Sequence, residues 1–213
     1  YTTDNNELSV EIKLPVAVLS GIKIDSANLT INGKNEIMSV EASILKLAYD
    51  TLKIENIRIN EQVNKGIILS EISTLDSKGK PSYLFANKIE TDTNSITISF
   101  QPDGLILDNI PWKTAESNSL KKLGNRWLAE QFVFTHEEQS AGFITSENSQ
   151  KIVFTNFGLQ NVINIIKYDN SQPMLKGNLD GEVIFPSSDN EKYIYANLAI
   201  KQLYLRYSLI GNI

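Results

Sequence analysis

Residues 175 to 185, "LKGNLDGEVIF", alternate between apolar and polar side chains with one exception, Ile184. Side chains of a β-strand point alternately to its two faces, so this stretch predicts one strand with a dry face and a wet face. The dry positions are Leu175, Gly177, Leu179, Gly181, Val183 and Phe185, and the wet ones are Lys176, Asn178, Asp180 and Glu182. Glycine fills no core and weakens a strand, so the two dry glycines require a specific reason.

Similar alternation covers most of the first hundred residues. Even positions from Leu8 to Val18 are apolar, which predicts one long strand or two strands that meet near Pro15. The apolar phase shifts by one residue near Ala27 and again near Leu45. Short apolar pairs at 52–59 then indicate further, shorter strands.

Short polar joints separate these strand-like segments. Asn32-Gly33 is a hairpin signal, because this dipeptide adopts the left-handed backbone that tight hairpin turns need. Residues 76–82, 101–104 and 186–191 are polar and rich in turn formers, which predicts three more turns. A mainly β chain with short connections is therefore expected.

Two segments interrupt the alternation. Residues 113–125 predict an irregular loop or a single helical turn that stops at Gly124. Residues 157–167 predict the one short helix, with Thr155 and Asn156 as possible caps. Its apolar residues at helical spacing, which we expect to cover one opening of the sheet, are Leu159, Val162, Ile163 and Ile166.

Composition excludes several classes of function. The 213 residues include 20 basic and 25 acidic side chains in small groups, with a net charge of −5, so no basic face for nucleic acid is expected. The absence of cysteine removes disulfides and thiolate chemistry. No run reaches the roughly 18 apolar residues that a spanning helix needs.

Catalytic and metal-binding patterns are weak. His136 is the single histidine, so a histidine metal cluster is excluded and a serine triad would depend on this one residue. A turn between two strands is the simpler interpretation of "FTHEEQS". The "GNLDG" segment has the wrong spacing for a phosphate loop, and the acidic strings do not match a calcium loop. We expect a chain that is not an enzyme.

Trp112 and Trp127 could stack on sugar rings if they lay on an exposed sheet, but packing in the core or at its rim is favoured for each. The apolar strand faces could close against each other as a β-sandwich, or stay open as a groove for apolar ligands. The alternation of residues does not separate these two arrangements.

The last third of the chain, residues 152–213, resembles the C-terminal region of bacterial TamB-type translocation and assembly module proteins, of the AsmA-like family, in the form found in Bacteroidetes. "VFTNFGLQNVINII" is similar to the short helix that begins with asparagine and phenylalanine, here Asn156 and Phe157. Leu175 to Gly181 match the Leu-x-Gly-x-Leu-x-Gly strand of the family. The following family strand, which leads towards a glycine, is matched by Ala196, Leu198, Ile200 and Gly211.

This resemblance implies a fold and a function. The fold is a long antiparallel, meandering sheet curled into a groove with an apolar interior, and residues 1–213 form a single β-groove segment of a larger protein. The function is non-catalytic: a bridge-like periplasmic protein, anchored in the inner membrane, that moves phospholipid between the membranes or supports outer-membrane protein assembly. The implied partners are phospholipid acyl chains, an outer-membrane barrel assembly protein and neighbouring segments of the same chain, without cofactor or metal.

The groove would be lined by the dry face of the opening stretch and by the strand after it. The residues expected to face lipid are Leu175, Gly177, Leu179, Gly181, Val183, Phe185, Ala196, Leu198 and Ile200. Glycine and alanine among them are expected to bend the sheet and to leave width for acyl chains. The alternative function is a structural or carbohydrate-binding β-sandwich module of a secreted or cell-envelope protein.

Overall fold

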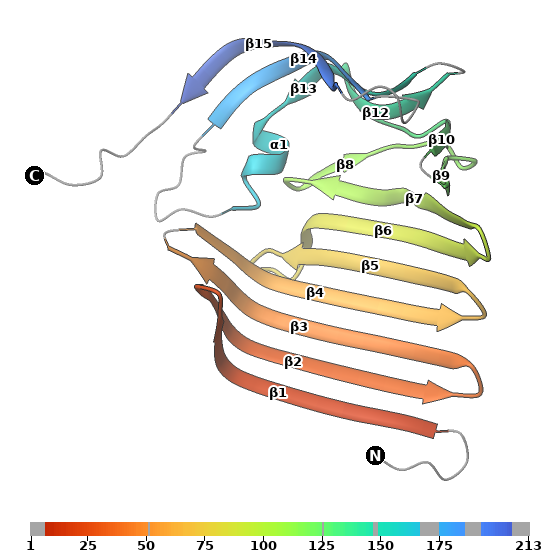
Figure 1. Cartoon of the computed structure of the whole chain (residues 1–213). Helices are drawn as coiled ribbons and strands as arrows, with labels where there is room; N and C mark the ends of the chain where they lie inside the picture. The colour runs from red at the N-terminus through yellow and green to blue at the C-terminus, as the bar shows by residue number, and fades with distance from the viewer. Residues whose placement is uncertain are drawn as a thin grey trace, which may run out of the picture.

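A computed structural model describes residues 7–50, 52–124, 126–146, 149–166, 175–185 and 193–205. Two antiparallel sheets and one short helix make up this part of the chain, and the sheets curl into an open, C-shaped surface (Figure 1). The prediction of a mainly β, meandering fold that forms a curled groove is confirmed. The predicted turn at 186–191, the helix end at 167 and Gly211 lie outside the described residues.

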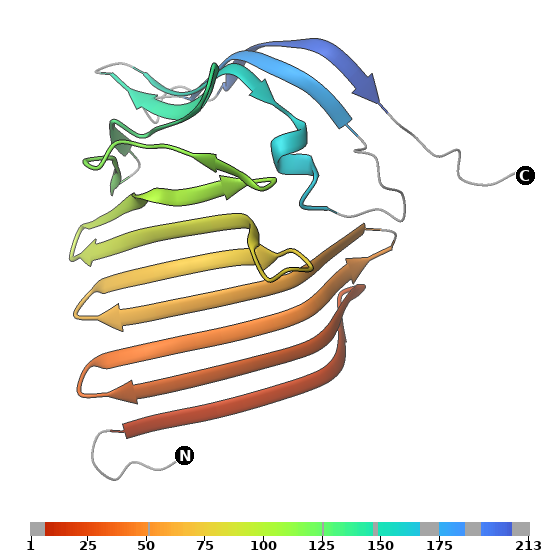
Figure 2. The same ribbon diagram turned by 180° about the vertical axis from the view of Figure 1, so that it is seen from behind.

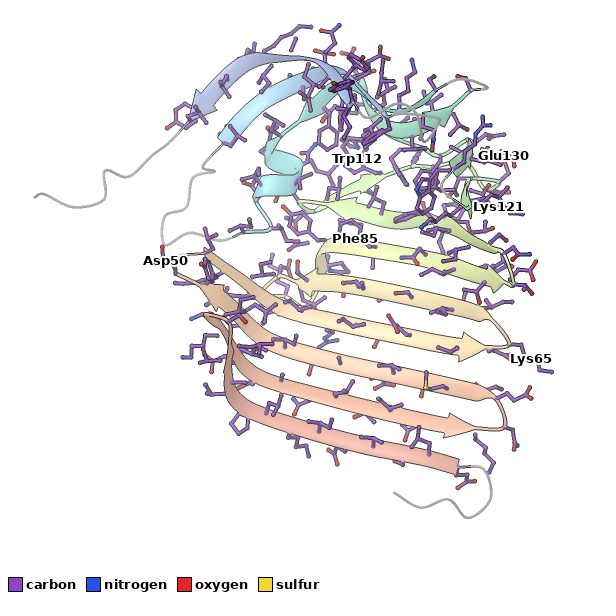
Figure 3. All side chains as sticks on the ribbon, in the orientation of Figure 1. Asp50, Lys65, Phe85, Trp112, Lys121 and Glu130 are labelled. Carbon is purple, nitrogen blue, oxygen red and sulfur yellow. The ribbon has the colours of Figure 1, made fainter. Side chains whose placement is uncertain are left out.

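The large sheet contains ten strands, and from β1 to β7 each strand pairs with the next one in the chain. Its strands are β1 (Glu7–Leu19), β2 (Ile22–Lys34), β3 (Ile37–Tyr49), β4 (Leu52–Asn64), β5 (Ile67–Leu75), β6 (Pro81–Asp92), β7 (Ser95–Leu107), β8 (Ile110–Trp112), β9 (Ser119–Leu123) and β10 (Arg126–Glu130). β8 pairs with β7 beside the path that continues to β9. Asp50 and Lys65 mark consecutive hairpin turns at opposite ends of the strands (Figure 3).

The small sheet contains five strands in chain order and lies over one end of the large sheet (Figure 2). Its strands are β11 (Val133–His136), β12 (Gln139–Thr145), β13 (Gln150–Gly158), β14 (Leu175–Phe185) and β15 (Tyr195–Leu205). The opening stretch of sequence is thus a single strand, β14, as its alternation predicts. Helix α1 (Gln160–Ile163) follows β13 and lies between the sheets (Figure 1).

Side-chain hydrogen bonds connect the two sheets at β10, where the pairing of backbone groups between strands of the large sheet ends. At the end of the large sheet, the backbone N–H of Trp127 donates to Gln150 Oε1 and that of Ala129 donates to Thr145 Oγ1, both at 2.9 Å. Gln150 is only 4% exposed. Two polar side chains of the small sheet therefore satisfy backbone groups of β10 that would otherwise need another strand.

One row of residues that is left out of the strand pairing explains why the apolar phase shifts. Pro15, Ser26, Leu45 and Asn56 occupy one transverse row of β1 to β4, and the pairing skips this row. Ser26 has φ of 50° and Asn56 has φ of 54°, a left-handed conformation uncommon within strands. We call this row the crease, because the strands bend there (Figure 1).

The crease accounts for the lengths of two strands. β1 is one bent strand that passes through Pro15, the first of the two arrangements that its alternation allows. The short apolar pairs at 52–59, which indicated separate short strands, belong to one strand of 13 residues, β4. The alternation looks interrupted because its phase shifts at Asn56, where φ is positive.

Two predicted turns are strands in the structure. Asn32 and Gly33 lie inside β2, where Gly33 pairs with Leu8, and the hairpin turns instead at Asn35 and Glu36. Residues 101–104 form a bulge within β7, because Phe100 pairs with Asn87 while Leu105 pairs with Phe85. The turn predicted at 76–82 is confirmed between β5 and β6, where Asp76 Oδ1 accepts from the backbone N–H groups of Lys78 and Lys80.

The two predicted interruptions also differ in detail. Residues 119–123 form β9 instead of a loop, and Gly124 follows the strand with φ of 57°. α1 starts at Gln160 and is shorter than predicted, because Asn156 and Phe157 still belong to β13. Its N-cap is Leu159, without a side-chain cap, so Thr155 and Asn156 do not cap it. Within the described residues, no helix is long and apolar enough to cross a membrane.

Candidate functional site

The inner face of the curled sheets is the candidate site. We define it as the face that carries the core residues Tyr83, Leu105, Phe157 and Leu179. Directly opposed residues of paired strands lie on the same face, so the pairing extends this face across the sheet. One transverse row consists of Ile12, Leu29, Ala42, Ile59, Ile72, Phe85, Leu105 and Trp112.

Coverage of this row changes along its length. Ile12 is 42% exposed and Ile72 is 40% exposed, whereas Leu105 is 5% and Trp112 is 1% exposed. On β1 to β5 the inner face has no buried apolar side chain among the described residues. The row therefore begins on an open apolar surface and ends in a closed core.

The closed end is formed where the small sheet lies over β6, β7 and β8. The Trp112 and Phe157 rings lie 5.4 Å apart between centroids, and Phe100 and Phe134 lie 4.9 Å apart edge to face. Burial raises the pKa of the Tyr83 hydroxyl, with a further contribution from the charge of Asp108. An apolar, water-poor environment thus surrounds this aromatic cluster.

A cavity of about 270 Å³ lies inside the closed end. Phe85, Leu105 and Trp112 contribute its large-sheet wall, while Ala141, Phe157 and Val162 contribute the opposite side. Figure 3 labels Phe85 in β6 and Trp112 in β8, two large-sheet residues of this wall that lie near α1 and the small sheet. Its accessible wall is made of carbon atoms, and Val162 is 48% exposed, so the cavity reaches the surface beside α1.

The structure brings most of the predicted lipid-facing residues onto the inner face. Leu179 belongs to the core cluster and pairs with Ile200, while Gly181 pairs with Leu198. Val183 pairs with Ala196, and Phe185 follows at the next inner position, with its ring 6.4 Å from that of Phe143. Leu198 and Ile200 are 44% and 45% exposed, so β15 is an open edge of the same face.

The start of β14 departs from regular pairing. Leu175 pairs with Leu205, and the register shifts between Lys176 and Asn178, so Gly177 lies opposite a bulge. The Gly177 carbonyl accepts a hydrogen bond from the backbone N–H of Leu159 at 2.9 Å. Gly177 therefore connects β14 to the start of α1 instead of simply lining a groove.

The two glycines bend β14 and do not widen the groove. Gly177 has φ of 146° and Gly181 has φ of 125°, angles that other residues rarely adopt. A Cβ at Gly181 would lie 2.0 Å from the backbone oxygen of Asn197, and one at Gly177 would lie 2.9 Å from Ile200 Cγ2. The expected bending is supported, whereas the expected open width is wrong because neighbouring atoms of β15 occupy that space.

The wet side of β14 is held by charges. Lys151 Nζ lies 2.8 Å from Glu182 Oε2, and Lys201 Nζ lies 3.0 Å from Asp180 Oδ2. Asp180 also accepts from the backbone N–H of Asn156 at 2.8 Å, at a bulge where Asn156 has φ of 45°. The pKa of Asp180 is lowered by this backbone hydrogen bond and then by Lys201.

A polar row on the inner face was not foreseen from the sequence. Glu61, Ser70 and Asn87 are opposed on β4, β5 and β6, between Val40 and Phe100. Ser70 is 6% exposed, and its Oγ lies 3.5 Å from Glu61 Oε1. Polar residues at positions where the alternation expects apolar ones could have pointed to this row. Their alignment, however, depends on the register of three strands.

The other residues considered from sequence have structural positions. His136 ends β11 at a turn, as expected, with Nδ1 3.1 Å from the Pro111 carbonyl oxygen. Trp112 is buried, so its expected place in the core is confirmed and it offers no face to a sugar ring. Lys122 lies over the Trp127 ring at 5.7 Å. Among the described residues, no group of three or more histidine, aspartate or glutamate side chains is placed to hold a metal ion.

Comparisons with known proteins leave the assignment to the geometry of this inner face. No protein-family model, no curated protein and no solved structure matches the chain.

Proposed function

We propose that the chain is a non-catalytic lipid-binding segment, in which the inner face of the curled sheets holds phospholipid acyl chains. The observation that carries this proposal is the partly exposed apolar row that crosses β1 to β5 with a polar face behind it. Contiguous exposed apolar surfaces of this kind mark interaction sites on proteins. The TamB-like sequence pattern of residues 152–213 supports placing the segment in a bridge-like periplasmic protein that moves phospholipid.

The energetics suit such a role. Each methylene buried contributes about 0.8 kcal/mol, so ten methylenes against the sheet contribute roughly 8 kcal/mol before the cost of ordering the chain. The attraction has no preferred direction, and a chain can therefore slide along the row without breaking specific hydrogen bonds. This combination of affinity and mobility is what transport between two membranes requires.

Adjacent residues of β3 allow a matched test. Ile44 lies on the inner face opposite Ala27 and Ile57, whereas Ser43 lies on the outer face opposite Asn28 and Arg58. Phospholipid that copurifies with the chain is extracted and quantified by mass spectrometry. We expect lipid in the wild type, a marked loss in Ile44→Asp and Leu198→Asp, and wild-type amounts in Ser43→Asp.

Two outcomes would contradict the proposal. A wild-type preparation free of phospholipid, and unable to take it up from vesicles, would remove lipid as the ligand. Equal losses in Ile44→Asp and Ser43→Asp would show that charge acts through folding instead of through the inner face. Circular dichroism of each variant separates these causes.

A further inference from the structure

The cavity at the closed end has no role in simple conduction along an open face. It is continuous with the apolar row, because the last three members of that row, Phe85, Leu105 and Trp112, form part of its wall. A chain that lies along the row from β1 towards β7 therefore meets the cavity at the end of its path. We propose that this cavity binds the methyl end of an acyl chain, so that lipids are held tail first at the closed end.

The wall chemistry selects hydrocarbon. Its accessible atoms are carbon, so a protein loop entering the cavity would bring backbone N–H and C=O groups that find no partner there. A headgroup or a carboxylate would meet the same difficulty with a full charge. The end of an acyl chain brings no polar group, and the exposed lining residue Val162 marks the mouth through which it would enter.

The size of the cavity matches part of a chain. An engineered apolar cavity of about 150 Å³ accommodates benzene, with six carbon atoms. By the same proportion, the cavity of about 270 Å³ accommodates about eleven carbon atoms. The carbonyl end of a longer chain then remains outside, on the open part of the inner face.

The two tryptophans provide a direct test of this orientation, which rests on the proposed function because it assumes a lipid ligand. Bromine quenches tryptophan fluorescence on contact, and Trp112 lines the cavity whereas Trp127 lies in β10. In a Trp127→Phe background, the chain is mixed with phosphatidylcholine vesicles whose acyl chains carry bromine either near the carbonyl or near the methyl end. We expect several-fold stronger quenching of Trp112 by the methyl-end bromine.

Two pairs of variants examine the cavity itself. Ala141→Leu fills it, while Ala199→Leu adds the same atoms on the outer face of β15, opposite Asp180. We expect Ala141→Leu to abolish the difference between the two bromine positions and Ala199→Leu to preserve it. If Ala141→Leu does not fold, Val162→Asp places a charge at the mouth, with Ile144→Asp on the outer face as its control at similar exposure.

The outcomes distinguish this inference from the proposed function. Lipid that copurifies and is lost in Ile44→Asp, together with equal or weaker quenching by methyl-end bromine, would overturn tail-first binding and leave the lipid-binding face intact. No copurifying lipid and no quenching by either probe would overturn both. Methyl-end quenching that persists unchanged in Ala141→Leu and Val162→Asp would place the chain end elsewhere.

Discussion

The open and closed parts of the inner face are built from the same alternating strands but differ in what covers them. β1 to β5 present apolar side chains that stay half exposed, whereas the corresponding residues of β6 to β8 are buried against β13 and β14. The difference comes from the small sheet, which lies over only one end of the large one (Figure 2). Alternation thus determines which face is apolar, while tertiary packing determines whether that face is a core or a binding surface.

The largest expected effect breaks the closed part. Trp112→Ala should lower the free energy of unfolding by about 3–5 kcal/mol, because it removes a fully buried aromatic side chain between the sheets. Leu29→Ala, on the open part of the same row, should cost only about 1 kcal/mol. Urea denaturation of both variants makes the comparison, and equal losses would mean that the two parts are equally well packed.

Asn118 should be the next most sensitive position. It is 2% exposed, its Oδ1 accepts from the backbone N–H of Phe100 at 2.8 Å, and its Nδ2 donates to the carbonyl oxygens of Phe100 and Ala115. Asn118→Ala removes the side-chain partner of the partly buried backbone N–H and C=O of Phe100, which should cost roughly 2–4 kcal/mol of unfolding free energy. Asn28→Ala, on the exposed outer face of β2, is a matched control that should change stability by less than about 0.5 kcal/mol.

The glycine at the bend of β14 tests the geometry of the open edge. Gly181→Ala should destabilise by about 1–3 kcal/mol, because its φ is positive and the added Cβ would collide with the backbone of β15. Gly33→Ala is the control, since its Cβ would lie 3.4 Å from Leu8 Cβ at an ordinary φ, and its effect should stay within about 0.5 kcal/mol. A neutral Gly181→Ala variant would mean that β14 and β15 separate without cost.

The smallest expected effect is a pH dependence with one contribution from each part. Asp180 in the small sheet and Asp76 in the β5–β6 turn both have lowered pKa values, each caused first by a backbone hydrogen bond. A carboxyl with a lowered pKa stabilises the folded state above its ordinary pKa of about 4, and this contribution is lost as the pH falls through the folded value. Melting temperatures measured through this acidic range should decline less steeply for Asp180→Asn and Asp76→Asn. If melting temperature fell with pH as steeply in both variants as in the wild type, these two carboxyl groups would not be the cause of the pH dependence.

Alternation and turn residues report local structure, so they were sufficient for the strand class, the short connections and the dry face of β14, whereas the meandering, curled sheet was expected only from the family resemblance. Alternation missed the continuity of β4, since nothing in the letter Asn56 reveals its positive φ. The Asn32-Gly33 signal was overridden by the register that pairs Gly33 with Leu8. The cavity could not be foreseen, because the contact between Trp112 and Phe157 joins residues of different sheets.

The nearest-neighbour pairing of the large sheet makes its length modular. From β1 to β7 each strand pairs with its predecessor and successor, so a hairpin can be removed at the β1 edge without rewiring any other pair. Adjacent strands lie about 4.8 Å apart, so each two-strand hairpin changes the length of the apolar row by about 10 Å. The length of the apolar row is therefore set by the number of hairpins. It does not depend on the closed end, where the row stops.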